Sequence, residues 1–303
     1  MGDPDDLNHG FFVPNFGPLA DPEELVEIAV AAEEGGWDGL FLADHLIDFA
    51  APETGEHRPI ADPWMTLAGA ASRTNHLRLG SYITPIARRQ PWQLARNLAT
   101  LDQLSDGRVI LGAGLGENFD YTTFGRDYEP RRLGRQYDEA LEVITGLWTG
   151  EPFSYDGEFY TIDDAVLRPT PVQEPRIPIL AGGWWPHKKP LQRGARWDGI
   201  MPQWPSMLQH FPNVVVDNLD PFYQDLIEEQ RSHEEEVREM FEYYHGLDAD
   251  PGEIMLRVEQ PSTPPDFADL CRELGVTWLL SRPVESDATH EENVARVRQG
   301  PPS

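Results

Sequence analysis

Cysteine, lysine and long hydrophobic runs are scarce in this sequence, and each scarcity excludes a class of protein. Cys271 is the only cysteine among 303 residues, so an intrachain disulfide and CxxC redox chemistry are excluded. No stretch approaches the ~18 consecutive apolar residues of a membrane-spanning helix. The acidic start, MGDPDDLNHG, has the features of neither a signal peptide nor a myristoylation site. We therefore expect a cytoplasmic protein that does not associate with membranes.

Positive charge is also scarce. The sequence has 24 Lys and Arg against 52 Asp and Glu, which gives a net charge of −28. Binding of nucleic acid or of anionic membranes needs clustered cations, so neither partner is expected. The lysines are only Lys188 and Lys189, and every other basic residue is arginine. Two explanations fit, a halophilic surface or an arginine-rich codon usage, and the acid excess favours the first because salt screens the self-repulsion.

What the sequence does contain is a regular alternation of short apolar runs and amphipathic stretches. Several helices are predicted to begin with Asp-Pro, as at Asp21–Pro22 and Asp62–Pro63, where Asp is the N-cap and Pro the first helical residue. Alternation of this kind predicts a parallel sheet with helical crossovers. Eight such units predict a single α/β domain over residues 1–303, a (β/α)8 TIM barrel, with an open doubly wound sheet as the alternative. The predicted strands contain GFFVPNF, DGLFLADH, LRLGSYI, RVILGAG, IPILAGG, DGIMP, EIMLRVE and TWLLS.

Two insertions exceed ordinary connections between strand and helix. Residues 114–131 follow strand four, and residues 150–176 precede strand five. The second insertion contains GEPFSYDGEFYTIDD, which predicts a small hairpin with YDGE as its turn. Long insertions in a barrel are usually functional or lid-like. A long polar helical region is also expected at residues 221–245.

Candidate catalytic residues stand at the ends of predicted strands, where the functional residues of a (β/α)8 barrel gather. His45, after strand two, can donate a hydrogen bond or a proton to a reacting ring, with Asp44 positioning either the ring or the loop. The alternative is that Asp44 caps a turn and His45 is half-exposed. Glu117 is a candidate acid-base group or a surface carboxylate. A metal site is not expected, because neither a zinc-binding helix motif nor EF-hand spacing is present.

The stretch GAGLGEN, residues 112–118, differs from a dinucleotide-binding fingerprint. Glu117 occupies the place of the third glycine, and the stretch follows the fourth strand instead of the first. We expect instead a wall beside a planar cofactor, built from Gly114, Gly116 and Asn118.

A second glycine loop ends the fifth predicted strand. Gly182 and Gly183 allow an anion to approach the backbone closely, and Trp184 and Trp185 should face the ligand. A helix predicted to start near Pro186 carries Lys188 in its first turn, so this loop is the candidate site for a cofactor phosphate. The alternative is that the lysines are solvated surface charges.

Several longer motifs occur in a fixed order over about residues 10–200: GGWDGLFLADH, AASRTNHLRLGSYITP, LATLDQLSDGRVILGAGLGEN, LEVITGLWTGEPFSYDGEFY and PVQEPRIPILAGGW. Together they resemble the bacterial luciferase-like superfamily of flavin- and deazaflavin-dependent oxidoreductases. The resemblance implies an enzyme, an oxidoreductase or monooxygenase, that holds FMN or coenzyme F-420 at the carboxyl ends of the strands and acts on a small organic substrate. Dimers are common among such proteins, so a homodimer is a further expectation.

The resemblance also implies local features of the site. Strand three should carry a bulge with a non-proline cis peptide, which we place at Ser81–Tyr82 behind the cofactor ring, with Gly80 supplying backbone freedom. Leu115 stands where the luciferases have an arginine for the flavin phosphate, so light emission is not expected. The Asp44–His45 pair resembles that of the deazaflavin enzymes and slightly favours F-420 over FMN. The alternative function is a cofactor-free barrel of the same superfamily with a ligand-binding or structural role.

Overall fold

The computed structural model describes residues 7–47, 57–205, 232–248, 252–257 and 267–301. All eight predicted strand positions are strands, they are parallel, and helices separate them along the chain, which is the (β/α)8 barrel fold. The chain divides into two compact units. One contains residues 12–178 and 283–303 and is called the 12–178 unit; the other contains residues 1–11 and 179–282 and is called the 179–282 unit. The expectation of a single domain therefore stays a prediction.

The 12–178 unit contains the second, third and fourth strand positions. β2 (Gly39–Leu42) pairs with β3 (Arg78–Ser81), and β3 pairs with β5 (Val109–Gly114). The third position continues as the short strand β4 (Thr84–Pro85), which pairs with the end of β5. Every residue of β2 and β5 is buried, as expected for parallel strands covered on both faces.

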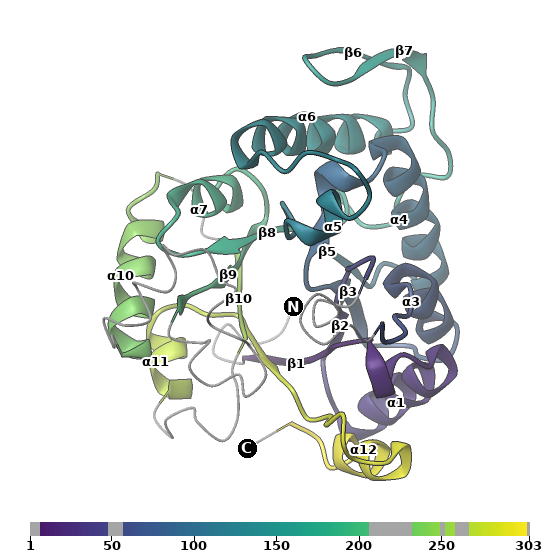
Figure 1. The fold of residues 1–303 in the computed structure, drawn as a ribbon, viewed down its shortest axis with the longest axis vertical. Coiled ribbons are helices and arrows are strands. Elements are labelled where there is room, and N and C mark those ends of the chain that lie inside the picture. Colours follow the sequence, from purple (N-terminus) through teal and green to yellow (C-terminus); the bar gives the residue numbers. More distant parts are fainter. Residues whose placement is uncertain (1–6, 48–56, 206–231, 249–251, 258–266, 302–303) are drawn as a thin grey trace. The chain divides into compact units, whose positions relative to one another are not determined.

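Five helices surround these strands. Figure 1 shows them as a row in which α12 lies beside α1, followed by α3, α4 and α6. The Asp-Pro starts are confirmed, because the Asp21 side chain accepts the N–H of Glu23 and Asp62 accepts that of Met65. Gly36 ends the first helix in the left-handed conformation, with φ of 80°. The helices are α1 (Pro22–Gly35), α3 (Pro63–Ala71), α4 (Pro91–Ser105), α6 (Pro130–Trp148) and α12 (His290–Val297).

The insertion at residues 150–176 forms the predicted hairpin. β6 (Phe153–Asp156) pairs antiparallel with β7 (Thr161–Ala165), so the turn is residues 157–160, two residues later than the predicted YDGE, whose Tyr155 and Asp156 belong to β6. Glu139 of α6 accepts the N–H groups of Glu158 and Phe159, so the hairpin turn is fixed to the helix. The other insertion contains a helix that was not predicted, α5 (Phe119–Thr122). Two 3-10 turns, η1 (Gly17–Leu19) and η2 (Ile86–Arg88), complete the unit.

The 179–282 unit contains the remaining strands. β1 (Asn8–Val13) pairs through residues 8–11 with β11 (Trp278–Ser281), followed in order by β10 (Glu253–Arg257), β9 (Gly199–Gln203) and β8 (Ile179–Trp184). Its helices are α7 (Lys188–Gly194), α10 (His233–His245) and α11 (Phe267–Glu273). α10 is the second part of the predicted helical region 221–245, and residues 221–231 lie outside the described residues.

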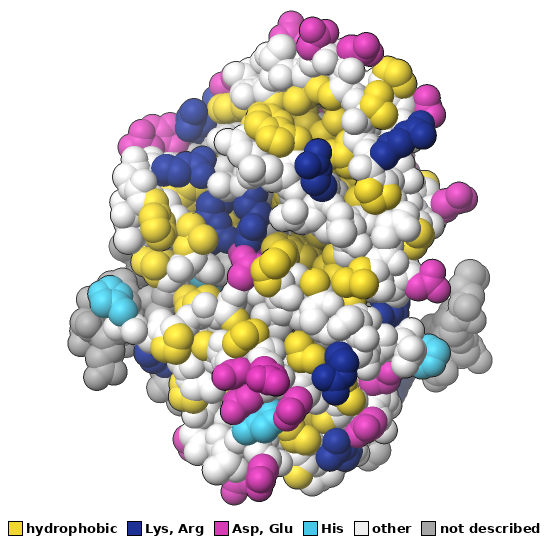
Figure 2. Space-filling view, turned by 90° about the vertical axis from the view of Figure 1, so that its right-hand side faces the viewer, with side chains coloured by type: hydrophobic (Ala, Val, Ile, Leu, Met, Phe, Trp, Pro, Cys, Tyr) yellow, Lys and Arg dark blue, Asp and Glu magenta, His cyan; other side chains and the backbone are white. Residues whose placement is uncertain are grey.

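Charged side chains cover much of the visible surface. Figure 2 shows acidic side chains round the margin and over the lower part of the face in view. Several arginines pair with exposed carboxylates, as in Arg135–Glu158 and Arg298–Glu34, with nitrogen–oxygen distances of 2.9 and 2.8 Å. Exposed pairs of this kind contribute little to stability, because water and salt screen them. The surface therefore carries far more negative charge than such pairs neutralise.

Candidate active site

The third strand position is interrupted at its carboxyl end. Ser81 ends β3 opposite Leu42, and the N–H of Tyr82 still donates to the Leu42 carbonyl at 2.8 Å. The chain then leaves the ladder and returns to it at Thr84 in β4. The bulge is confirmed, but the cis peptide is Tyr82–Ile83, not Ser81–Tyr82. The prediction placed the cis bond one residue too early. Tyr82 still has its ladder hydrogen bond, and the chain leaves the ladder only after this residue.

Gly80 has a different role from the one expected. It lies inside β3, and a Cβ built on it would be 2.7 Å from the carbonyl oxygen of Ile110 and 2.7 Å from Cε1 of Phe41. Real Cβ atoms do not approach other atoms so closely. Glycine is therefore needed there because the two neighbouring strands pack against its backbone, and backbone freedom for the bulge is not the reason.

Asp44 follows β2 and is almost completely buried, with 1% of its side chain exposed. Arg89 donates to its carboxylate through Nε at 3.1 Å and Nη2 at 2.6 Å, and Thr84 donates at 2.9 Å. Arg88 pairs with the same carboxylate and donates to the Asp44 carbonyl at 2.8 Å. Burial alone would raise the pKa of Asp44, but the Arg89 and Arg88 guanidinium groups outweigh it and lower that pKa. Asp44 thus ties the loop after β2 to the segment after the bulge.

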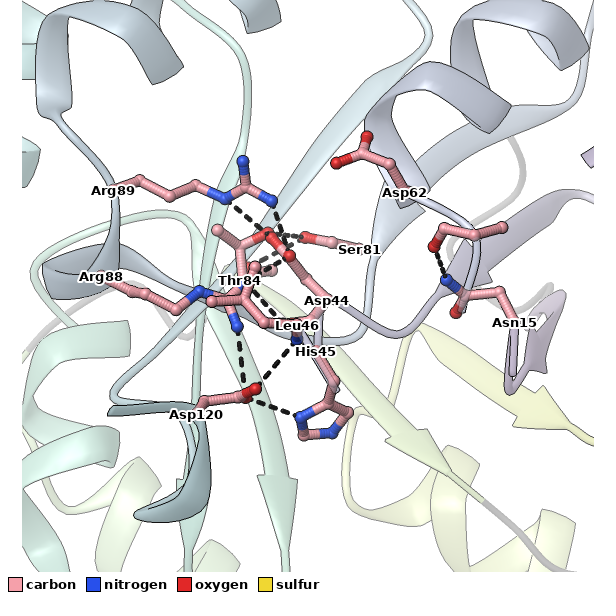
Figure 3. Close-up of polar contacts among 12 residues, drawn as sticks. Asn15, Asp44, His45, Leu46, Asp62, Ser81, Thr84, Arg88, Arg89 and Asp120 are labelled. Carbon is pink, nitrogen blue, oxygen red and sulfur yellow. Dashed lines mark hydrogen bonds and ion pairs between the residues drawn. The ribbon is translucent and has the colours of Figure 1, made fainter. Parts of the chain in front are cut away.

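His45 has a different carboxylate as its partner. Its Nδ1 lies 2.8 Å from Oδ2 of Asp120, which belongs to α5, and 26% of its side chain is exposed. The other oxygen of Asp120 accepts the backbone N–H of Leu46 at 2.9 Å. Figure 3 shows the His45 ring turned toward Asp120, while Asp44 turns toward Arg88 and Arg89. The contacts of Asp44 with Arg88, Arg89 and Thr84 favour a role in positioning the loop, and that role stays a prediction.

Glu117 completes this cluster. Part of Glu117 is exposed to solvent, but the protein atoms packed around its carboxylate raise the pKa of Glu117. The charge of His45 opposes that shift, and the carboxylate of Asp120 adds to it. Burial, together with the charge of Glu117, raises the pKa of Tyr128 to about 12. The site therefore holds a carboxyl group with a raised pKa that interacts electrostatically with an imidazole.

The insertion that carries Glu117 and Asp120 is held in place by several hydrogen bonds. Arg126 donates to the carbonyls of Ala87 and Arg88 at 3.1 and 3.0 Å. Tyr121 donates to the Leu115 carbonyl at 2.7 Å, and Tyr128 donates to the Gly116 carbonyl at 3.0 Å. These bonds fix residues 114–131 against η2.

Ser81, Tyr82 and Gly114, three of the predicted cofactor-binding residues, are buried at the bulge and beside it. The Ser81 hydroxyl donates to the Gly112 carbonyl at 3.1 Å, and its oxygen lies 2.9 Å from the hydroxyl oxygen of Thr84. The Tyr82 ring lies 5.4 Å from that of Phe12. Gly114 ends β5 opposite Pro85. The side chain of Ser81 thus joins β3 to β5, and its role toward a cofactor stays a prediction.

The expected glycine wall is explained in part by the fold. Gly116 has φ of 80°, and a Cβ there would lie 2.6 Å from Pro85. Asn118 is exposed at the start of α5, where its carbonyl accepts the N–H of Tyr121. Leu115, at the position of the luciferase arginine, packs against the apolar cluster formed by Ala87, Tyr121 and Leu133.

The predicted phosphate loop belongs to the 179–282 unit. Gly182 and Trp184 lie in β8, and a Cβ on Gly183 would be 2.4 Å from Cγ of Pro190, so close packing of α7 requires this glycine. Lys188 begins α7, with its Nζ 4.6 Å from the centre of the Tyr243 ring. The phosphate role of these residues stays a prediction.

One aromatic residue of this loop was assigned wrongly. Trp185 was expected to face a ligand, but it is 5% exposed and belongs to the hydrophobic core of its unit with Trp204 and Phe241. Its backbone N–H donates to the carbonyl of Gln203 at 2.7 Å, which extends the parallel ladder of β8 and β9 by one bond.

Sequence reasoning missed Arg88, Arg89 and Asp120. The arginine pair had a detectable signal, because two adjacent cations directly after a barrel strand are unusual in so acidic a chain. Asp120 had none, since it lies 75 residues from His45. In the part of the chain that the structure describes, His, Cys, Asp and Glu form no group of three or more suited to a metal ion. None of the helices described is both long and apolar enough to span a bilayer.

Comparison with known proteins identifies the family. Residues 8–204 match the model of the luciferase-like monooxygenases, which is more than half of the chain. The chain therefore belongs to the luciferase-like monooxygenase family. This agrees with the resemblance seen in the sequence motifs.

Among its relatives is the F-420-dependent glucose-6-phosphate dehydrogenase of Nakamurella multipartita, 31% identical over 292 residues that cover 91% of this chain and 83% of the relative. The enzyme of the same name from Microbacterium testaceum is 39% identical over 168 residues, 54% of this chain, and the chain spans only about half (48%) of that relative's length. A monooxygenase of Streptomyces bottropensis has a similar fold, with a TM-score of 0.71, 20% identity and 97% of each chain covered.

Proposed function

We propose that this protein is a cytoplasmic oxidoreductase that uses coenzyme F-420 to move a hydride between the cofactor and a small hydroxylated substrate. The observation that carries the proposal is the cluster of His45, Glu117 and Asp120 at the carboxyl end of the strands, beside the bulge in strand three. The names of the relatives support F-420 as the cofactor and a sugar phosphate as a first substrate to test.

The residues at the bulge fit a flat ring. Ser81, Tyr82 and Thr84 are buried, so between Ser81 and Pro85 the surface consists mainly of backbone and the partly exposed Ile83. No charged side chain projects from this segment. Gly114 and Gly116 add no side chain at the adjoining end of β5. We assign the ring to the backbone of residues 81–84. When bound, the deazaflavin supplies hydride acceptance and donation at ring position 5.

The chain's own groups supply the proton chemistry. An alcohol that becomes a carbonyl loses a hydride from carbon and a proton from oxygen. His45 takes the hydroxyl proton as general base. Glu117, whose pKa is raised, provides the proton that balances the charge of the hydride on the cofactor. An imidazole beside a carboxyl group whose pKa is raised is an arrangement suited to paired base and acid roles.

The first experiment is to purify the protein and titrate it with F-420 and with FMN while recording visible absorbance. Binding and reduction of F-420 by glucose 6-phosphate or another alcohol supports the proposal. Preference for FMN with oxygen consumption would make the protein a monooxygenase, and binding of neither cofactor would contradict the proposal.

The second experiment concerns His45. We expect His45→Ala to bind the cofactor normally and to lower turnover by ~10²-fold or more, the scale of a lost acid-base group. An unchanged turnover would leave His45 as a half-exposed residue without a catalytic role. Gel filtration of the same preparations tests the expected homodimer.

A further inference from the structure

The ring of His45 is held by a carboxylate that is buried and belongs to another element. Asp120 has 0% of its side chain exposed, and its two oxygens bind the ring and the backbone of the same loop. Oδ2 lies 2.8 Å from Nδ1 of His45, and Oδ1 accepts the N–H of Leu46 at 2.9 Å. One carboxylate therefore fixes both the ring and the backbone beside it (Figure 3).

Asp120 is itself anchored by a cation. Nη1 of Arg88 lies 3.2 Å from Oδ2 of Asp120, and Nη2 of the same group donates to the Asp44 carbonyl at 2.8 Å. Only 4% of the Arg88 side chain is exposed. Arg88 thus contacts both carboxylates, Asp44 and Asp120.

The donors round Asp120 decide where the histidine proton lies. A guanidinium and a backbone N–H can only donate, and an ionised carboxylate can only accept. The Nδ1 nitrogen faces this accepting carboxylate, so the hydrogen bond requires a proton on Nδ1. In the neutral ring the acceptor lone pair is then on Nε2.

We propose that Asp120 is the positioning residue of His45: it holds the neutral ring in the Nδ1–H tautomer, so that Nε2 is the nitrogen that exchanges a proton with the substrate. The catalytic part of this statement rests on the proposed function, and the tautomer does not. The arrangement follows the logic by which a buried carboxylate orients a histidine base in other enzymes.

The test variant is Asp120→Asn. An amide offers one accepting oxygen in place of two, while the Leu46 N–H and His45 Nδ1 face the two oxygens of Asp120 and the Arg88 cation lies beside one of them. Either orientation of the amide therefore sets a donor against a donor. Asp127→Asn is the matched control, because Asp127 is an exposed carboxylate on the same insertion.

The first measurement is independent of any cofactor. Long-range ¹H–¹⁵N spectra of histidine-labelled protein distinguish the two tautomers, and comparison with His45→Gln assigns the signal. We expect the neutral ring of the wild type and of Asp127→Asn to carry its proton on Nδ1, and Asp120→Asn to lose this preference. A wild-type ring protonated on Nε2 would overturn the proposal, even if Asp120→Asn proved unable to fold.

The second measurement is kinetic and uses the cofactor that the protein binds. Asp120→Asn should lower kcat by ~10²-fold with cofactor affinity within about twofold of wild type, and Asp127→Asn should behave as wild type. Wild-type kcat in Asp120→Asn would show that the ring needs no such partner. If the wild type binds no flavin-type cofactor, the proposed function is wrong. The positioning role of Asp120 is then decided by the tautomer measurement alone.

Discussion

Replacement of Asp44 by Asn should destabilise the protein without direct damage to the proton chemistry at His45. The carboxylate is 1% exposed and receives bonds from Thr84, Arg88 and Arg89. Removal of one partner from a buried ion pair typically costs ~3–5 kcal/mol, because the other charge stays buried. In the variant Arg88 still has Asp120 as an ionic partner, and 22% of the Arg89 side chain is exposed to water. We therefore expect Asp44→Asn to lower the free energy of unfolding by about 3 kcal/mol, and Asp44→Ala to lower it more.

That loss can be expressed as a melting temperature. Globular proteins have an unfolding entropy of about 2.1 cal/mol/K per residue, which for 303 residues gives about 0.6 kcal/mol/K. A loss of about 3 kcal/mol then lowers the Tm by about 5 °C if the chain unfolds as one. Calorimetry of wild type, Asp44→Asn and the exposed control Asp127→Asn, all without cofactor, measures this difference.

The pH dependence of the loss gives a second check. The folded-state pKa of Asp44 is lowered, so its contribution is fully present above the unfolded pKa of about 3.9 and is lost as the pH falls through the folded value. The gap in Tm between wild type and Asp44→Asn should therefore be complete at neutral pH and shrink below about pH 4. A gap under about 1 °C at neutral pH would refute the view that Asp44 secures the loop.

Two further predictions follow from packing and surface charge. Gly80→Ala should lower the free energy of unfolding, measured in urea, by about 1–3 kcal/mol, because the added Cβ would meet Ile110 and Phe41. Phe41→Leu in the same chain should recover part of this loss. Wild-type stability of Gly80→Ala would contradict the close approach of the neighbouring strands. The Tm should rise between low and molar KCl, because screening of 52 acidic against 24 basic groups outweighs the weakening of exposed ion pairs. A flat curve would favour codon usage as the reason for the many arginines.

The barrel could be predicted because its signals are local. A strand buried on both faces appears as a short apolar run, and the Asp-Pro starts at Asp21 and Asp62 mark helices within a few residues. The hairpin at residues 150–176 has a glycine turn between two strands that alternate in burial. By contrast, α5 has four residues and no side-chain cap, so nothing in the sequence marks it.

The sequence alone also predicts that Asp44 and His45 lie at a strand end, but it does not predict which residues they contact. The two residues are neighbours in the loop directly after β2. Asp44 turns toward Arg88 and Arg89, and His45 turns toward α5. The carboxylate adjacent in sequence is therefore bonded to the arginines, and the carboxylate at the His45 ring is Asp120. The orienting group has to come from another element, here 75 residues further along the chain.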